Sequence, residues 1–165
     1  VILGMELQGV AVSDARERAL PFLHKYGLGG FESKYPSELS GGMRQRAALL
    51  RTMLYDSEIM LLDEPFGALD AQTRTQMQEW LLQLWQDFGK TVLFVTHDVE
   101  EAVFLSDEIY VMSARPGRIK AILEVPLARP RVKHMALEPA FIGIKERCME
   151  LLTEEAQVLT PVEAA

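Results

Sequence analysis

The sequence is short of cysteine, of basic residues and of long apolar stretches. Cys148 is the single cysteine in 165 residues, which excludes an internal disulfide and leaves a packed or idle thiol as its simplest role. Lysine and arginine number 17 against 24 acidic residues, a formal net charge of −7. We therefore expect no nucleic acid as the main partner, because phosphate-backbone binding relies on excess basic residues. No run of about 18 apolar residues and no signal-peptide pattern is present, so we expect any membrane contact to go through another protein.

The chain also lacks an initiating methionine. It begins with Val1 inside an apolar segment, and we interpret it as a piece of a longer protein. At 165 residues and 48% hydrophobic, it is long enough for one modest core and too short for two.

The first informative stretch is Ser40-Gly41-Gly42, at the start of an amphipathic helix expected over residues 41–54. A serine and two glycines at a helix N-terminus leave backbone N–H groups free to hold an anion such as a phosphate. Taken alone, the same residues are equally compatible with an ordinary helix cap. The arginines of this helix, 44, 46 and 51, fit either a solvated face or an electrostatic contribution to the turn.

The second informative stretch is the apolar run 59–62, followed by Asp63 and Glu64. We predict that residues 58–62 form a buried strand of a parallel sheet, with both carboxylates at its carboxyl end, where open α/β sheets place ligands. On its own, the acidic pair is also what a solvated strand end would carry.

The remaining pattern predicts alternating helices and strands. Apolar residues at helical spacing put Trp80 and Trp85 in the core of a long helix, which Gly89 closes in the left-handed conformation. Asp98 and Glu101 fit the cap and third position of a short helix. The predicted helices span residues 15–26 (capped by Ser13 or Asp14 and interrupted by Pro21), 72–88, 98–105 and 140–155, and the predicted strands span 91–96, 108–112 and 118–125.

Two further motifs follow in order: Gly67-Ala68-Leu69-Asp70 after the acidic pair, and Thr96-His97-Asp98 after the next strand. Together the four motifs resemble the ATP-binding cassette (ABC) ATPases of membrane transporters, over about residues 36–119. The resemblance implies an α/β fold: a P-loop NTPase-like parallel sheet with flanking helices, incomplete, plus part of the helical subdomain. It divides the chain into a partial helical subdomain (1–57), an α/β core (58–125) and a C-terminal tail (126–165).

The resemblance also implies a role for each motif. In that family Ser-Gly-Gly is the signature, the strand with Asp-Glu is Walker B, Ala-Leu-Asp is the D-loop and the histidine is the switch histidine. Here Met43 stands where the commonest signature has glutamine, which leaves a role for that side chain open. The implied roles are Mg²⁺ binding by Asp63, polarisation of the attacking water by Glu64 and contact with the γ-phosphate by His97. The implied ATP-binding residues are Ser40, Gly41, Gly42 and Asp70, and the loop of Asp70 also contacts the opposite subunit. Without the resemblance, Asp70 is most simply a helix cap and His97 a core histidine, while His24 and His134 match no motif and are expected on the surface.

The chain has no phosphate-binding P-loop, which in the family precedes these motifs. Gly89-Lys90-Thr91 matches its last three residues, but Leu84 stands where the motif needs glycine, and the segment follows a helix and opens a strand. We therefore expect the chain to bind ATP poorly and to hydrolyse none by itself. Complete family members pair head to tail around two ATP molecules, so this chain could complete only a partner's site.

Residues 111–119 and Arg129-Pro130-Arg131 look like the ATPases of bacterial nitrate, sulfonate and taurine importers. The implied partners are permease subunits, a second ATPase subunit and, indirectly, a solute-binding protein, with the ATPase on the cytoplasmic side of the membrane.

One alternative is a non-transport ABC ATPase acting on nucleic acid or in translation. The acidic charge, the absence of a coiled-coil insertion and the compact spacing from Ser40 to Asp63 argue against this alternative. Another is a bare interaction domain, which an ATP-turnover assay would distinguish.

Overall fold

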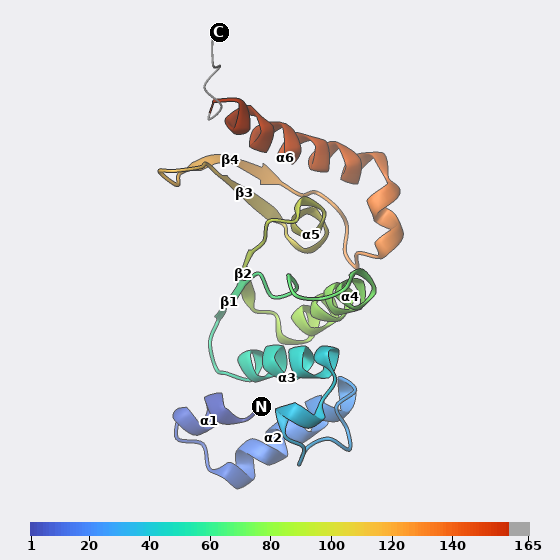
Figure 1. Ribbon diagram of the computed structural model, residues 1–165. Helices are drawn as coiled ribbons and strands as arrows, with labels where there is room; N and C mark the ends of the chain where they lie inside the picture. Colours follow the sequence, from blue (N-terminus) through green and yellow to red (C-terminus); the bar gives the residue numbers. More distant parts are fainter. Residues whose placement is uncertain (159–165) are drawn as a thin grey trace. The chain divides into compact units, whose positions relative to one another are not determined.

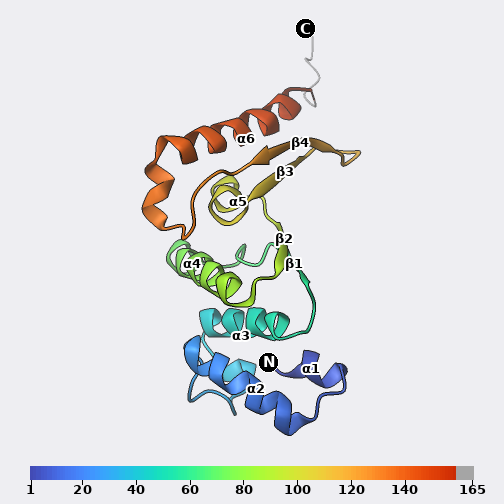
Figure 2. The same cartoon turned by 180° about the vertical axis from the view of Figure 1, so that it is seen from behind.

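The computed structural model describes the backbone of residues 1–158 and the side chains up to residue 153 (Figure 1, and from behind in Figure 2). The chain divides into two compact units, Val1–Leu93 and Phe94–Ala165, and each is described by itself. The last residues of the expected tail, 159–165, lie outside the described part. The predicted alternation of helices and strands is confirmed.

The first unit is mainly helical. Its short helix α1 packs against α2 and α3, and α3 packs against α4. A small apolar core of Met5, Ala15 and Ala19 lies where α1 meets α2. The helices are α1 (Leu3–Leu7), α2 (Val12–Lys25), the 3-10 turn η1 (Pro36–Glu38), α3 (Gly41–Met53) and α4 (Ala71–Phe88).

The start of α2 corrects the sequence prediction. The helix begins at Val12, after Ala11, and no side chain caps it. Ser13 Oγ donates to Asp14 Oδ1 at 2.9 Å and so pairs with its neighbour instead of capping. The Ala15 N–H donates to the Ala11 carbonyl at 2.9 Å, so the helical hydrogen bonds begin before the polar residues. Pro21 lies within the helix, as predicted.

The two strands β1 (Ile59–Asp63) and β2 (Thr91–Val95) are neighbours in one sheet, and α4 connects them. A helical crossover of this kind joins parallel strands. The prediction that residues 58–62 form a buried strand is confirmed for one face of β1 and wrong for the other. Met60 and Leu62 are buried, but Ile59 is 59% exposed and Leu61 68% exposed. Within the part of the chain that the structure describes, only one face of β1 is covered, so burial alternates along it.

Helix α4 follows the predicted apolar stripe, with Met77, Leu81 and Leu84 buried. The two tryptophans lie at the margin of this stripe and are half-buried, so their assignment to the core is wrong. Trp85 Nε1 donates to the Lys90 carbonyl at 2.8 Å, which holds the indole beside the turn that follows. This partner explains the position of Trp85 only, because Trp80 Nε1 is buried without a hydrogen-bond partner among the described residues.

The second unit packs α6 against α5 and against the hairpin of β3 and β4, as both views show (Figure 1, Figure 2). The hairpin is antiparallel, with a bulge between Val111 and Met112, and its strands lie within the strands predicted over residues 108–112 and 118–125. Cys148 lies on α6 and is only 2% exposed, a packed thiol whose pKa burial raises. The elements are α5 (Val99–Leu105), β3 (Glu108–Met112), β4 (Ile119–Glu124), the 3-10 helix η2 (Lys133–Leu137) and α6 (Pro139–Val158).

Across residues 1–158, none of the helices is both long enough and apolar enough to span a membrane.

Gly89 provides a test of the turn between α4 and β2. Its φ of 62° is left-handed, as predicted, and its N–H donates to the Trp85 carbonyl at 2.8 Å. We expect Gly89→Ala to destabilise the protein by about 1 kcal/mol, because a β-carbon is strained in this conformation. Gly89→Asn should cost less, since asparagine tolerates the left-handed region. Urea unfolding of the three proteins measures both effects, and equal stability of the alanine variant and the parent would contradict the prediction.

Candidate functional site

The N-terminus of α3 forms the first part of the expected site. Ser40 has an extended backbone and caps the helix, its Oγ accepting from the Met43 N–H at 3.3 Å. The Ser40 carbonyl accepts from the Arg44 N–H at 2.9 Å, which begins the helical hydrogen-bond series. Because the first N–H groups of a helix have no partner within it, Gly41 and Gly42 present donors at the positive end of the helix dipole.

A side-chain hydrogen bond ties this helix to the segment after β1. Gln45 Nε2, on the second turn of α3, donates to the Pro65 carbonyl at 2.5 Å. Pro65 directly follows the acidic pair in sequence. The signature helix and the carboxyl end of β1 are therefore held in one arrangement. The sequence analysis did not predict this role of Gln45, and the only available signal was its position five residues after Ser40.

The acidic pair lies at the carboxyl end of β1. Asp63 is the last residue of the strand and Glu64 the next, and both are exposed. Glu64 has a φ of 42°, and no other non-glycine residue in the described part of the chain has a positive φ. A residue held in this region costs about 1–3 kcal/mol, and such strain gathers at functional sites. No pattern in the sequence predicts this backbone conformation.

The segment after Glu64 turns back beside its carboxylate. The Gly67 N–H donates to the Glu64 carbonyl at 3.2 Å. A β-carbon at position 67 would lie 3.5 Å from Glu64 Oε2, in ordinary contact distance. Glycine therefore leaves the space next to this carboxylate open.

Asp70 ends the D-loop and caps α4. Its Oδ1 accepts from the Thr73 N–H at 3.0 Å, which confirms the cap suggested by the sequence. Hydrogen bonds from Thr73 hold the pKa of the Asp70 carboxyl below its ordinary value. The Leu69 carbonyl accepts from Arg74 Nη2 at 3.1 Å, which fixes the loop just before the cap.

The signature turn and the D-loop line the same cavity, which has a volume of about 510 Å³. Two helix N-termini, those of α3 and α4, thus open onto one space, together with the guanidinium side chain of Arg46. Helix N-termini and a cation favour an anion, whereas the Asp70 carboxylate is the one acidic side chain among the lining residues. The lining residues are Ser40, Gly41, Gly42, Arg46, Ala68, Leu69, Asp70, Thr73, Gln76, Met77 and Trp80.

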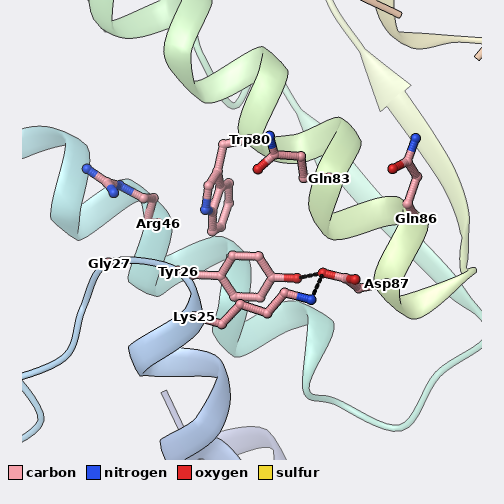
Figure 3. A pocket seen from close by; sticks show the side chains of 8 residues that line it. All are labelled: Lys25, Tyr26, Gly27, Arg46, Trp80, Gln83, Gln86 and Asp87. Atoms are coloured by element: carbon pink, nitrogen blue, oxygen red, sulfur yellow. Dashed lines mark hydrogen bonds and ion pairs between the residues drawn. The ribbon is translucent and has the colours of Figure 1, made fainter. Parts of the chain in front are cut away.

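Arg46 and Trp80 also line a neighbouring cavity of about 460 Å³, shown in Figure 3. There the Trp80 ring stands between Arg46 and Tyr26, and the Tyr26 and Trp80 rings meet edge to face with centroids 5.4 Å apart. Lys25 Nζ lies 2.7 Å from the Asp87 carboxylate, which also accepts from the Tyr26 hydroxyl.

These contacts explain two shifted pKa values. The hydrogen bonds from Lys25 and then Tyr26 lower the pKa of Asp87, whereas burial and the bond to Asp87 raise the pKa of Tyr26. Arg46 and Trp80 line both this cavity and the one at the signature turn. Helical periodicity placed Trp80 in the core and could not reveal this position.

His97 belongs to the second unit. It is exposed, so the core-histidine alternative is wrong. It lies between Thr96 and Asp98, whose Oδ1 accepts from the Glu101 N–H at 3.1 Å and caps α5, as predicted. The Asp98 N–H in turn donates to Thr96 Oγ1 at 3.0 Å, so the residues immediately before and after the histidine are hydrogen-bonded to each other.

The two other histidines lie on the surface, as predicted. His24 is 60% exposed beside Glu32, and the His134 side chain is 75% exposed.

Comparison with known proteins gives consistent matches. Residues 4–67 match the family model described as ABC transporter. An uncharacterized ABC transporter ATP-binding protein of Methanocaldococcus jannaschii is 49% identical over 155 residues, covering 94% of this chain and 57% of that protein. The taurine import ATP-binding protein TauB of Escherichia coli is 41% identical over 165 residues, covering 97% of this chain and 65% of that protein. The chain thus spans less than two thirds of the length of these curated relatives.

A solved structure gives the same picture for the fold. A chain described as an inward-facing conformation of a putative metal-chelate type ABC transporter superposes with a TM-score of 0.64 at 23% identity. The match covers 75% of this chain and 50% of that one. The predicted ABC-ATPase fold, incomplete in this chain, is confirmed.

The cap at Asp70 yields a pH-dependent prediction. Asp70→Ala should lower the free energy of unfolding at neutral pH, because it leaves the Thr73 N–H without its acceptor. Asp70→Asn keeps a neutral acceptor and should cost less. Folding lowers the pKa of the Asp70 carboxyl. Its ionised form therefore stabilises the folded protein fully at pH values above the pKa of the unfolded chain, about 3.9. This stabilisation is lost as the pH falls through the lower pKa of the folded state. Urea unfolding at neutral and acidic pH should show the alanine penalty shrinking in acid, and a constant penalty would contradict this account.

Proposed function

Since the chain belongs to the ABC transporter family of ATP-binding proteins, we propose that the whole protein is the ATP-binding and ATP-hydrolysing subunit of an importer for small oxyanion solutes of the nitrate, sulfonate or taurine kind. The similarity to TauB supports the importer type. Residues 111–119 and Arg129-Pro130-Arg131 support the same subgroup. In this proposal the protein binds permease subunits peripherally at the cytoplasmic side of the membrane, and a solute-binding protein delivers the solute.

The observation that carries the proposal is the cavity shared by the signature turn and the D-loop. Two helix N-termini and the Arg46 side chain line it, a setting that favours an anion. This arrangement suits a phosphate brought by another subunit. We infer that Ser40, Gly41 and Gly42 bind the γ-phosphate of an ATP held by a partner subunit, and that Asp70 lies at the contact between the two subunits.

The acidic pair supplies the hydrolytic chemistry. An exposed carboxylate at a strand end is the type of ligand with which proteins hold Mg²⁺ beside nucleotide phosphates, and Asp63 fits this role. Mg²⁺, when bound, neutralises charge on the phosphates. Glu64 accepts a proton from the attacking water and orients it, its backbone held in the strained conformation described above. His97 donates to the γ-phosphate from the loop before α5.

Glu64→Gln tests the role of the carboxylate. In the full-length protein it should lower steady-state ATP turnover by roughly 10²–10⁴-fold, the usual contribution of a general base. ATP binding should be retained, because glutamine keeps the shape of the side chain. Glu58→Gln, at an exposed acidic residue just before the same strand, is the matched control and should turn over normally. An unimpaired rate in Glu64→Gln would show that Glu64 is not the base.

Gly42→Asp tests the signature turn, in a Glu64→Gln background that slows turnover. A carboxylate beside the incoming phosphate should prevent ATP-dependent pairing of two subunits, a penalty of roughly 2–5 kcal/mol for a buried like-charge contact. Nucleotide binding by the isolated subunit should remain. Size-exclusion chromatography with ATP measures the pairing.

Gly42→Ala is the control for this substitution. A β-carbon at position 42 would lie 3.6 Å from Thr73 Cγ2, an ordinary contact, so alanine does not disturb the local packing. Loss of pairing with aspartate beyond that with alanine isolates the effect of charge. If Gly42→Asp dimerises with ATP as its parent does, the signature assignment is wrong.

A further inference from the structure

The Arg131 side chain makes six hydrogen bonds within the described part of the second unit, in a segment to which the proposed function gives no chemical role. The side chain is only 1% exposed. Its pKa is lowered, first by burial and then by the nearby charge of Arg129. A buried cation is costly unless it is well hydrogen-bonded, so this position requires compensating contacts.

Those contacts converge on the end of α5. Arg131 Nη1 donates to the Ser106 carbonyl at 2.6 Å, the Phe104 carbonyl at 3.2 Å and the Val103 carbonyl at 3.4 Å. Arg129 Nη2 donates to the Leu105 carbonyl at 3.1 Å. The two arginines, which we call the arginine clamp, thus satisfy the carbonyls of four consecutive residues, 103–106.

The clamp also binds the segments around α5. Both arginines contact Asp107 Oδ1, with Arg129 Nη2 at 2.8 Å and Arg131 Nη2 at 3.3 Å. Arg131 Nη2 further donates to the carbonyls of Val125 and Leu127, each at 3.3 Å. The end of α5, the start of β3 and the chain after β4 are therefore joined by two guanidinium groups.

Helix α5 depends on such contacts because it is short. It spans Val99–Leu105, and an isolated helix of this length is unstable in water. A cation at its C-terminus stabilises its last carbonyls and its dipole. At its other end Asp98 caps it, and His97 directly precedes that cap. Any shift of α5 therefore shifts the backbone that carries His97.

We infer that the arginine clamp is the positioning device for the switch histidine: Arg131 and Arg129 hold α5 at its C-terminus, and α5 holds His97 at its N-terminus. The inference rests on the proposed function insofar as His97 contacts the γ-phosphate. Neither arginine touches nucleotide in this account, and both act through the helix.

The first test is a double-mutant cycle in the full-length protein. Arg131→Lys keeps a cation but cannot reach several carbonyls at once. It should lower kcat about tenfold or more, since a misplacement of about 1 Å can cost 10²-fold, while KM for ATP stays within about twofold. In a His97→Ala background the same substitution should have no further effect on kcat. A loss of kcat that is equally large in both backgrounds would show that Arg131 does not act through His97.

The second test is hydrogen exchange, which needs no ATPase activity. Arg131→Lys should speed amide exchange in α5 and in the loop of His97, while Arg147→Lys, at an exposed arginine of the same unit, should leave it unchanged. Unchanged exchange in the Arg131 variant overturns the clamp. Faster exchange together with normal turnover by His97→Ala supports the clamp but refutes the role of His97 in the proposed function.

Arg129→Lys serves as the milder variant, because the Arg129 side chain is 20% exposed and makes fewer contacts with carbonyls. It should shift both readouts in the same direction as Arg131→Lys, by a smaller factor. If it alters neither exchange nor kcat while Arg131→Lys is unfolded, the clamp fails as a positioning device.

Discussion

The arrangement of the first unit depends on how α3 is fixed against the end of β1. The Gln45 side chain donates from the second turn of α3 to the Pro65 carbonyl, and α3 also packs on α4. Because these two contacts involve different elements, they leave α3 little freedom to rotate. The free N–H groups at its start consequently open onto the space bounded by the D-loop. The orientation of this helix N-terminus is thus a product of helix packing and one amide contact, and the groups that it presents are backbone N–H donors.

Local chemistry explains which features could be foreseen. Caps and turns are decided by one residue and its nearest neighbours, so Ser40, Asp70, Asp98 and Gly89 could all be placed from the sequence. The hairpin of β3 and β4 was equally accessible, because its turn and alternation lie within one short segment. The order of motifs then identified the fold, since four short patterns in sequence are far more specific than any one of them.

What could not be foreseen depends on contacts between distant segments. The exposed faces of Ile59 and Leu61 follow from what packs on β1, which an apolar run does not reveal. Trp80 satisfied a helical stripe yet faces two cavities, because the stripe only gives its angle around the helix. The contacts of Arg131 lie with residues 103–107 and 125–127, brought to it by the path of the chain after β4. The Arg-Pro-Arg motif resembles the importer ATPases, but that resemblance does not predict the hydrogen bonds that Arg131 donates to these carbonyls.

The backbone at Glu64 has an implication for engineering the protein. Glycine or asparagine would suit a φ of 42° better than glutamate does, so thermodynamic optimisation of the fold favours discarding the carboxylate. A library screened only for heat resistance would therefore enrich substitutions at this codon and remove the carboxylate to which we assign the general-base role. Consensus or inverse-folding redesign faces the same bias, and the codon should be held fixed or screened jointly for turnover.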